Sequence, residues 1–309
     1  MSIDLSVVVN FHNMTREAPR TLHTLSRGGQ RGIDALSYEV LAIDNGSTMP
    51  LSASVVEGFG SAGAEFRYVF HGTKSPSPVE AINAAVRRAR GRYVVVMIDG
   101  AHMVSPGVLA GMGAAFRAYA EAFVATLPLH LGPGVQNVTV LNGYNQSAED
   151  AMLARIDWQR DGYELFRAAG STSDGSMGWF GALFESNCFG MPKAAFERLG
   201  GFHPGFMSPG GGLVNLDFFR LAVESPDLAY VLLLGEATFH QYHGGVTSNV
   251  ALQAHPWEVL HAEYVRLRGN RYIRPVRPPI LLGTMPRQAI ELGLSSANVG
   301  LKWWGQVPR

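Results

Sequence analysis

The sequence predicts an α/β protein with a mostly parallel central sheet and helices on both of its faces. Apolar runs of strand length alternate with helical segments over residues 5–99, which is typical of parallel strands joined by crossover helices. The run from Tyr93 to Ile98 has no polar alternation, as expected for a strand buried on both faces. Asp99 follows it directly, where open α/β sheets bind ligands. A role in a site and a role in capping the next turn both stay open for Asp99.

The elements before Asp99 come in the order that this fold class requires. Thr15 suits the N-cap of a first helix that runs through Leu22 and Leu25. Residues 44–48, Asp-Asn-Gly-Ser-Thr, form a dense turn cluster that ends a buried strand. The expected strands span residues 5–11, 38–43, 66–70 and 93–98, and a second helix with one apolar face spans residues 78–90.

After Asp99 the pattern is less regular, because glycines interrupt it. We expect helices over residues 105–122, 148–160, 192–199, 215–223 and 257–267, and extended segments over 123–129, 184–191 and 229–234. Residues 169–178 and 208–212 are glycine-rich loops, and the first is long enough for a substrate-binding segment. The composition shifts after residue 250, and Trp303 and Trp304 would be costly to expose, so we expect them to pack on the body or on a partner.

Composition argues against several classes of protein, among them nucleic-acid-binding, disulfide-bonded and membrane-spanning proteins. The 25 basic and 25 acidic side chains cancel, so no basic footprint for nucleic acid is expected. The single cysteine, Cys188, excludes an internal disulfide and a cysteine-based zinc site. The first residues lack the pattern of a signal peptide, and no apolar run approaches about 18 residues, so no membrane span is expected. These observations favour a cytoplasmic protein.

Four segments together resemble the family 2 glycosyltransferases of the GT-A fold, over roughly residues 4–250. The segments, in order, are Ser6–Val9 with the helix around Leu22, Ile43–Thr48, Asn83 through Asp99 to Pro106, and Pro192–Phe202 with Asp217 and the histidines beyond it. The most specific are Asp-Asn-Gly-Ser-Thr at 44–48 and Phe-Glu-Arg-Leu-Gly-Gly-Phe at 196–202.

The resemblance implies an enzyme that moves a sugar from a nucleoside diphosphate sugar to an acceptor hydroxyl, as an inverting hexosyltransferase. Its partners would be the nucleotide-sugar donor and a carbohydrate or small-molecule acceptor, and a homodimer stays open. It also implies a domain of residues 1–250, with a nucleotide-binding half at 1–105 and an acceptor half at 106–250. Residues 251–309 would then be an extension that packs on the body or on a partner.

The resemblance assigns nucleotide-sugar binding to Asp44, Asn83 and Asp99. Asp44 matches the residue that contacts the base or ribose, and a carboxylate accepts hydrogen bonds from either group. An alternative role for Asp44 is to form the turn. Asn83 either shapes the same pocket or lies on the helix surface.

The family's metal motif, Asp-x-Asp, is only partly present. Asp99 matches its first acid, whereas the usual second and third acids fall on Ala101 and His102. His102 would favour Mn²⁺ over Mg²⁺, or would instead hydrogen-bond a phosphate. His240 and His243, which precede Gly244 and Gly245, match the place where the family supplies a further ligand. A mixed oxygen and nitrogen site and a purely structural role both stay open for these two histidines.

The general base of the family is an acid at the start of a helix after a glycine-rich loop. That acidic pair is missing here, and Val214 and Asn215 stand near its place. Asp217 is the nearest carboxylate and our first candidate, although a first-turn aspartate also stabilises a helix. Glu185 is the reserve candidate.

Two other functions compete with glycosyl transfer. The departures at Ala101 and at Val214-Asn215 favour a catalytically impaired protein that binds a nucleotide sugar without turning it over. A nucleotidyltransferase or another nucleotide-sugar enzyme is the other alternative, and the lack of a glycine-rich phosphate loop after any expected strand weighs against it.

Overall fold

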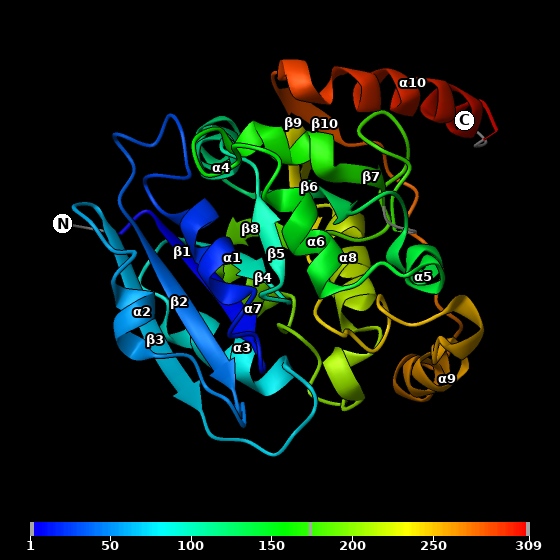
Figure 1. Ribbon diagram of the computed structural model, residues 1–309. Coiled ribbons are helices and arrows are strands. Elements are labelled where there is room, and N and C mark those ends of the chain that lie inside the picture. Colours follow the sequence, from blue (N-terminus) through cyan, green and yellow to red (C-terminus); the bar gives the residue numbers. More distant parts are fainter. Residues whose placement is uncertain (1–2, 173–174, 307–309) are drawn as a thin grey trace.

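The computed structural model describes residues 3–172 and 175–306 and is built around a ten-stranded sheet (Figure 1). The strand order is β10-β9-β6-β8-β4-β1-β2-β3, with β5 beside β9 and β7 beside β6. The strands are β1 (Leu5–Phe11), β2 (Tyr38–Asn45), β3 (Ala64–His71), β4 (Tyr93–Met97), β5 (His102–Val104), β6 (Ala122–Leu131), β7 (Ala169–Thr172), β8 (Cys188–Pro192), β9 (Ala229–His240) and β10 (Ile280–Gly283).

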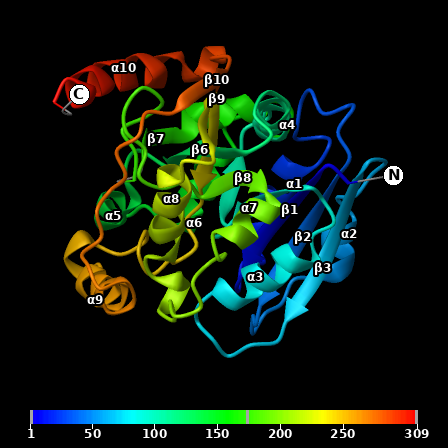
Figure 2. The ribbon, with the colours of Figure 1, turned by 180° about the vertical axis from the view of Figure 1, so that it is seen from behind.

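Helices cover both faces of the sheet. They are α1 (Ala18–Leu25), α2 (Ala53–Glu57), α3 (Val79–Arg88), α4 (Val108–Ala118), α5 (Gln136–Thr139), α6 (Gln146–Leu153), α7 (Lys193–Arg198), α8 (Val214–Glu224), α9 (Trp257–Arg268) and α10 (Ile290–Trp304). Short 3₁₀ helices are η1 (Val140–Asn142), η2 (Gly162–Ala168), η3 (Pro209–Gly211), η4 (Leu252–Ala254) and η5 (Arg287–Ala289). Figure 1 shows α1 and α4 in front of the sheet, and Figure 2, seen from the opposite side, shows α3, α7 and α8 on the other face.

Successive residues of β1 enter two different apolar cores. Val7 and Val9 pack in the cluster that contains the α1 and α4 side chains, whereas Val8 packs in the cluster that contains those of α3, α7 and α8. Every residue of β1 is buried, and the strand is apolar except for Ser6 and Asn10. The strands β4, β1, β2 and β3 are all parallel, so the prediction of an α/β fold with a mostly parallel sheet is confirmed.

Two differences from the expected strands shape the site. The strand expected over 229–234 continues to His240, because Gly235 takes a φ of +80° and the register shifts there without ending the ladder. The short strand β5 pairs with its end and places His102 opposite His240. Three residues carry too little periodicity to predict such a strand.

The segment after residue 250 adds to the same sheet. Its helix expected over 257–267 is present as α9, and β10 pairs in parallel with β9. Trp304 donates a hydrogen bond to the Phe180 carbonyl, and Trp303 packs edge-on against Phe184. Among the described residues, no helix has both the length and the apolarity to cross a membrane.

Candidate active site

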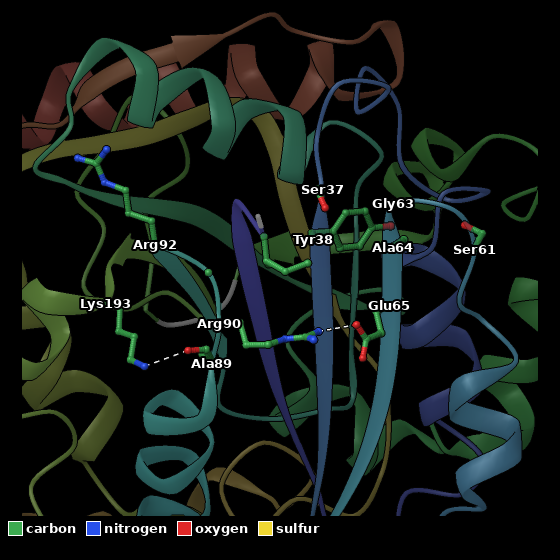
Figure 3. A pocket seen from close by; sticks show the side chains of 12 residues that line it. Ser37, Tyr38, Ser61, Gly63, Ala64, Glu65, Ala89, Arg90, Arg92 and Lys193 are labelled. Carbon is green, nitrogen blue, oxygen red and sulfur yellow. Dashed lines mark hydrogen bonds and ion pairs between the residues drawn. The ribbon is translucent and has the colours of Figure 1, made fainter. Parts of the chain in front are cut away.

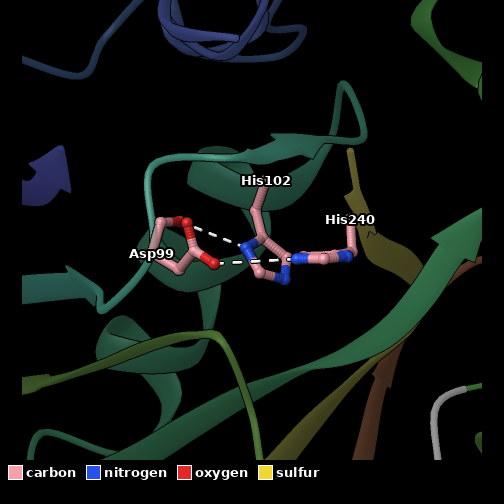
Figure 4. A group of neighbouring side chains, drawn as sticks. All are labelled: Asp99, His102 and His240. Carbon is pink, nitrogen blue, oxygen red and sulfur yellow. Dashed lines mark hydrogen bonds and ion pairs between the residues drawn. The ribbon is translucent and has the colours of Figure 1, made fainter. Parts of the chain in front are cut away.

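Three histidines lie side by side on neighbouring strands at one edge of the sheet. His240 at the end of β9 is paired with His102 of β5 on one side and with His130 of β6 on the other. The ring centroids are 4.7 Å apart for His102 and His240 and 5.4 Å apart for His130 and His240. Asp99 lies in the connection between β4 and β5, so its carboxylate meets the same histidines (Figure 4). His130 was not predicted, because a lone histidine in an apolar strand gives no signal.

Asp99, His240 and His243 converge at atomic distances. Asp99 Oδ2 is 3.1 Å from His243 Nε2 and 3.6 Å from His240 Nε2, and the two Nε2 atoms are 3.2 Å apart. Asp99, His102 and His240 also each offer a ligand atom within 4.8 Å of the others. Neighbouring ligand atoms of a small divalent cation with bonds of about 2.1 Å are roughly 3.0–3.4 Å apart. The spacing therefore fits such a cation, and the donor set of one carboxylate with imidazoles suits Mn²⁺ better than Mg²⁺.

Hydrogen bonds fix the tautomers that metal binding would need. His102 Nδ1 donates to the Asp99 carbonyl at 3.1 Å, and His240 Nδ1 donates to Gln136 Oε1 at 2.8 Å. Both histidines therefore keep the lone pair on Nε2. His130 has the opposite tautomer, because its Nδ1 accepts the Gln136 backbone N–H at 3.2 Å and its Nε2 then carries the proton. The three strand histidines thus offer two nitrogen ligands and one N–H donor.

Burial and charge set the protonation of this cluster. Burial alone would raise the pKa of Asp99, but the charge of His243 and the hydrogen bond that His243 donates hold that pKa well below its ordinary value. Burial lowers the pKa of His102 and of His240, and lowers that of His130 to about 4. Burial also opposes protonation of His243, but the charge of Asp99 outweighs it and raises the His243 pKa. Asp99 is therefore ionised and the strand histidines are neutral near pH 7.

A buried amide network holds the loop that carries His243. Asn249 Oδ1 accepts the backbone N–H groups of His243, Gly244 and Gly245 at 2.9–3.0 Å. Asn249 Nδ2 donates to Gln136 Oε1 at 2.6 Å, and Gln136 Nε2 donates to the His240 carbonyl at 3.0 Å. Gln136 is fully buried and connects both histidines to one frame. The sequence around residue 136 gave no reason to single it out.

Asp44 lies at the same edge as Asp99, with β1 between their strands. It is fully buried, and its carboxylate accepts the backbone N–H groups of Ser47 and Leu51 and the Tyr68 hydroxyl. Its contacts hold the turn at 44–51. Nearby on β1 and β2, the side-chain oxygens of Asn10 and Asn45 are buried and have no hydrogen-bond partner among the described residues.

Asn83 joins α3 to the loop that carries Gly-Gly-Phe at residues 200–202. Its Nδ2 donates to the Phe202 carbonyl at 2.7 Å, and its Oδ1 accepts the Phe202 N–H at 3.0 Å. The nitrogen and the oxygen of the Asn83 side-chain amide therefore both bond to the backbone of Phe202.

Asp217, our first candidate base, forms a bidentate ion pair with Arg268 of α9, at 2.8 Å from Nε and 2.5 Å from Nη2. It is 3% exposed, and this contact ties α8 to α9. Glu185, the reserve candidate, lies instead at the edge where the histidines meet. It lines a hollow of about 130 Å³, which we call the inner hollow, together with Asp99, His102, His130, Asn187 and His240.

A second hollow, the outer hollow, adjoins the inner one and has a volume of about 490 Å³. The two share His130, Glu185, Thr247 and Ser248 in their walls. Asn215, which stands near the place of the missing acidic pair, lines the outer hollow and donates to Asn187 Oδ1 at 3.3 Å. The Glu185 carboxylate therefore lies between the Asp99–histidine cluster and the outer hollow.

A third hollow lies at the opposite edge of the sheet, where β2, β3 and β4 begin, and measures about 870 Å³ (Figure 3). Two of its three cations already have polar partners, and the third, Arg92, lies over the Tyr93 ring at 5.2 Å. Arg90 pairs with Glu39 and Glu65, and Lys193 Nζ donates to the carbonyls of Arg87 and Ala89. Ligands of open α/β sheets bind at the carboxyl ends of strands, so this groove is not our candidate site.

Comparison with protein families gives a direct match. The model of "Glycosyl transferase family 2" matches residues 6–173, which is more than half of the chain. The chain belongs to this family. The family prediction made from the four segments is therefore confirmed.

Solved structures show the same fold. TarS 1–349 of S. aureus matches with a TM-score of 0.50 at 13% identity, over 77% of this chain and 60% of that one. The same TarS segment in complex with UDP-GlcNAc matches with a TM-score of 0.52 at 14% identity, over 88% of this chain and 68% of that one. The first match thus spans about three fifths of the TarS segment. The curated proteins gave no match.

Proposed function

We propose that the protein is an inverting glycosyltransferase that uses a nucleoside diphosphate sugar as donor. Mn²⁺ or Mg²⁺ would be held at the edge of the sheet where Asp99 meets the histidines. The observation that carries the proposal is the convergence of Asp99 Oδ2 with the Nε2 atoms of His240 and His243 within 3.6 Å of one another. His102 Nε2 completes the proposed ligand set. A divalent cation at this place, when bound, supplies positive charge that stabilises the departing diphosphate.

The other residues of the edge have proposed roles in binding and proton transfer. His130 presents an N–H donor to the inner hollow, where it suits a phosphate oxygen. Glu185 accepts the proton of the acceptor hydroxyl as general base. The acceptor oxygen then bonds to the anomeric carbon, the bond from that carbon to the diphosphate oxygen breaks, and the nucleoside diphosphate leaves.

The nucleotide end of the donor is proposed to lie toward β1 and β2. Asp44 holds the turn there, at the carboxyl end of β2. The role of Asn83 is to keep the Gly-Gly-Phe loop beside α3.

A catalytically impaired, donor-binding protein is the second candidate. Its support is that Ala101, at the place of a family acid, is fully buried, and that Asn215 stands near the place of the missing acidic pair. The two candidates differ in turnover, whereas both bind the donor.

The test is release of nucleoside diphosphate from UDP-glucose, UDP-GlcNAc and GDP-mannose with Mn²⁺, with Mg²⁺ or with a chelator. We expect release with a metal, its loss in Asp99→Asn and its retention in Asp157→Asn, since Asp157 is an exposed acid whose partner is Arg160. Donor binding by calorimetry without any release would favour the impaired protein. Equal release by the wild type and Asp99→Asn would refute the proposed site.

A further inference from the structure

The outer hollow is built from parts of the chain that are distant in sequence. Its walls come from the region after β6, from the segment around Glu185, from the start of α8 and from residues 247–274. The C-terminal segment contributes His255, Trp257, Leu260, Tyr272 and Arg274. The hollow opens beside the inner hollow through the shared residues Glu185 and His130. It therefore has the position of a subsite for the molecule that faces the donor.

Glu185 is held at the junction of the two hollows. A side chain at residue 175 would collide with the Glu185 carboxylate, so the glycine there lets the backbone lie close to it. Burial raises the pKa of Tyr272, and the negative charge of Glu185 raises it further, while Arg274 lowers it. Glu185 and Arg274 thus act on the same wall of the outer hollow.

Aromatic rings form part of that wall. Trp257 is 39% exposed and is stacked on His261, with ring centroids 5.6 Å apart and an angle of 14° between the planes. Tyr272 and Phe184 line the hollow as well. Flat apolar faces of this kind, with a few polar groups, suit the C–H face of a sugar ring.

Arg274 brings a positive charge to the hollow. Its guanidinium carbon lies 4.5 Å from the centroid of the Phe184 ring, and Trp303 packs edge-on against the same ring at 5.7 Å. Within the described part of the chain, Arg274 has no ion pair, in contrast to Arg268, which pairs with Asp217. A cation oriented by an aromatic ring and left without a protein carboxylate is ready to bind an anion.

We propose that the outer hollow binds the acceptor, and that this acceptor is a saccharide carrying a carboxylate or phosphate group, which Arg274 binds. The inference rests on the proposed function, because it places the acceptor hydroxyl at Glu185. Arg274 lines the outer hollow and not the inner one, so its anion is that of the acceptor and not the donor diphosphate. On transfer, the hydroxyl proton passes to Glu185, the acceptor oxygen bonds to the anomeric carbon, and the nucleoside diphosphate leaves.

The test compares matched neutral and anionic sugars on the full chain with UDP and Mn²⁺ present. Glucose, glucuronic acid and glucose 6-phosphate differ at one carbon, and galactose, galacturonic acid and galactose 6-phosphate form a second set. Saturation-transfer NMR measures their binding, and mass spectrometry with a donor panel measures their use as acceptors. We expect an anionic member to bind about tenfold or more tightly than its neutral counterpart, as for other charged hydrogen bonds. The carboxylate and phosphate arms identify which anion is preferred.

Variants assign the preference to one side chain. Arg274→Gln should remove it, Arg274→Lys should retain part of it, and Arg271→Gln should leave it unchanged, because Arg271 is exposed and does not line the hollow. Thermal unfolding of each variant reports whether it folds.

Equal binding of neutral and anionic sugars would overturn the inference, as would a preference that survives Arg274→Gln. Weaker UDP binding in Arg274→Gln with unchanged sugar binding would also overturn it, because it would place Arg274 in the donor site. If no donor is turned over but the Arg274-dependent preference is present, the binding of an anionic saccharide in the outer hollow stands and the proposed transfer activity fails.

Discussion

Replacing Gln136 by methionine should weaken Mn²⁺ binding without touching a proposed ligand. Gln136 Oε1 accepts hydrogen bonds from His240 Nδ1 at 2.8 Å and from Asn249 Nδ2 at 2.6 Å. The first bond selects the tautomer with its lone pair on Nε2, and the second holds the loop of His243. Methionine has a similar length but no strong acceptor, so His240 would lose both its fixed tautomer and its orientation.

The magnitude follows from what is left unpaired. Removing a partner of a metal-binding histidine lowers metal affinity by roughly 10- to 100-fold, or about 1.4–2.7 kcal/mol. The variant also leaves buried donors on His240 and Asn249 unpaired, together with the carbonyl oxygens that Gln136 Nε2 now contacts at 3.0 and 3.2 Å. Each such group costs about 1–3 kcal/mol, so the free energy of unfolding should fall by several kcal/mol.

Calorimetric titration with Mn²⁺ and thermal unfolding at several Mn²⁺ concentrations measure the two effects separately. Gln136→Glu is the informative companion, because its carboxylate still accepts from His240 Nδ1 and should preserve Mn²⁺ affinity better than methionine does. Gln159→Met, at an exposed position, controls for the change of residue type. Wild-type Mn²⁺ affinity in a folded Gln136→Met protein would refute the reasoning. If the wild type itself does not bind Mn²⁺, the proposed metal site is wrong.

Three further variants test charged residues. Glu185→Gln should lower kcat by roughly 10²- to 10⁴-fold with little change in donor Kd, and an equal loss in both would argue against a general base. Asp217→Asn should lower the free energy of unfolding by about 2–4 kcal/mol through its pair with Arg268, whereas a loss of kcat at unchanged stability would restore Asp217 as the base. Burial opposes ionisation of Glu39, but hydrogen bonds from Ser6 and Arg90 outweigh burial and lower the Glu39 pKa. Ionised Glu39 therefore stabilises the folded protein above the unfolded pKa of about 4.3, and this contribution is lost as pH falls through the folded pKa. Denaturant titrations from pH 7 to 3 should therefore show a smaller acid-side loss in Glu39→Gln than in the wild type, and parallel curves would contradict this.

The part of the fold before Asp99 was predictable from the sequence because its elements are regular. The strand expected over residues 5–11 matches β1, and the valine run before Asp99 matches β4 to within a residue. Strands of this kind are buried on both faces, so their composition alone identifies them. Asp99 was expected at the carboxyl end of β4, and the structure places it there, directly before β5.

The remainder of the site depends on contacts between distant residues, which periodicity does not record. Gln136 and Asn249 are 113 positions apart and meet through a single hydrogen bond. His130 became a candidate only when β6 was seen to pair with β9. Asp217 has the place expected of a helix-start acid, and only the structure shows the guanidinium of Arg268 across from it.

The departure at Ala101 has a structural explanation in the direction of its side chain. Ala101 is fully buried and packs in the apolar cluster beneath α1 and α4, so an acid at this position would enter that cluster and not the site. Its carbonyl accepts the backbone N–H of Gln241, which fixes the connection before β5 against the end of β9. The same pairing sets His102 opposite His240. The contact between residue 101 and the end of β9 therefore keeps the Ala101 side chain away from the site and places the His102 imidazole in it. This site would rely on nitrogen ligands where the family uses a second carboxylate.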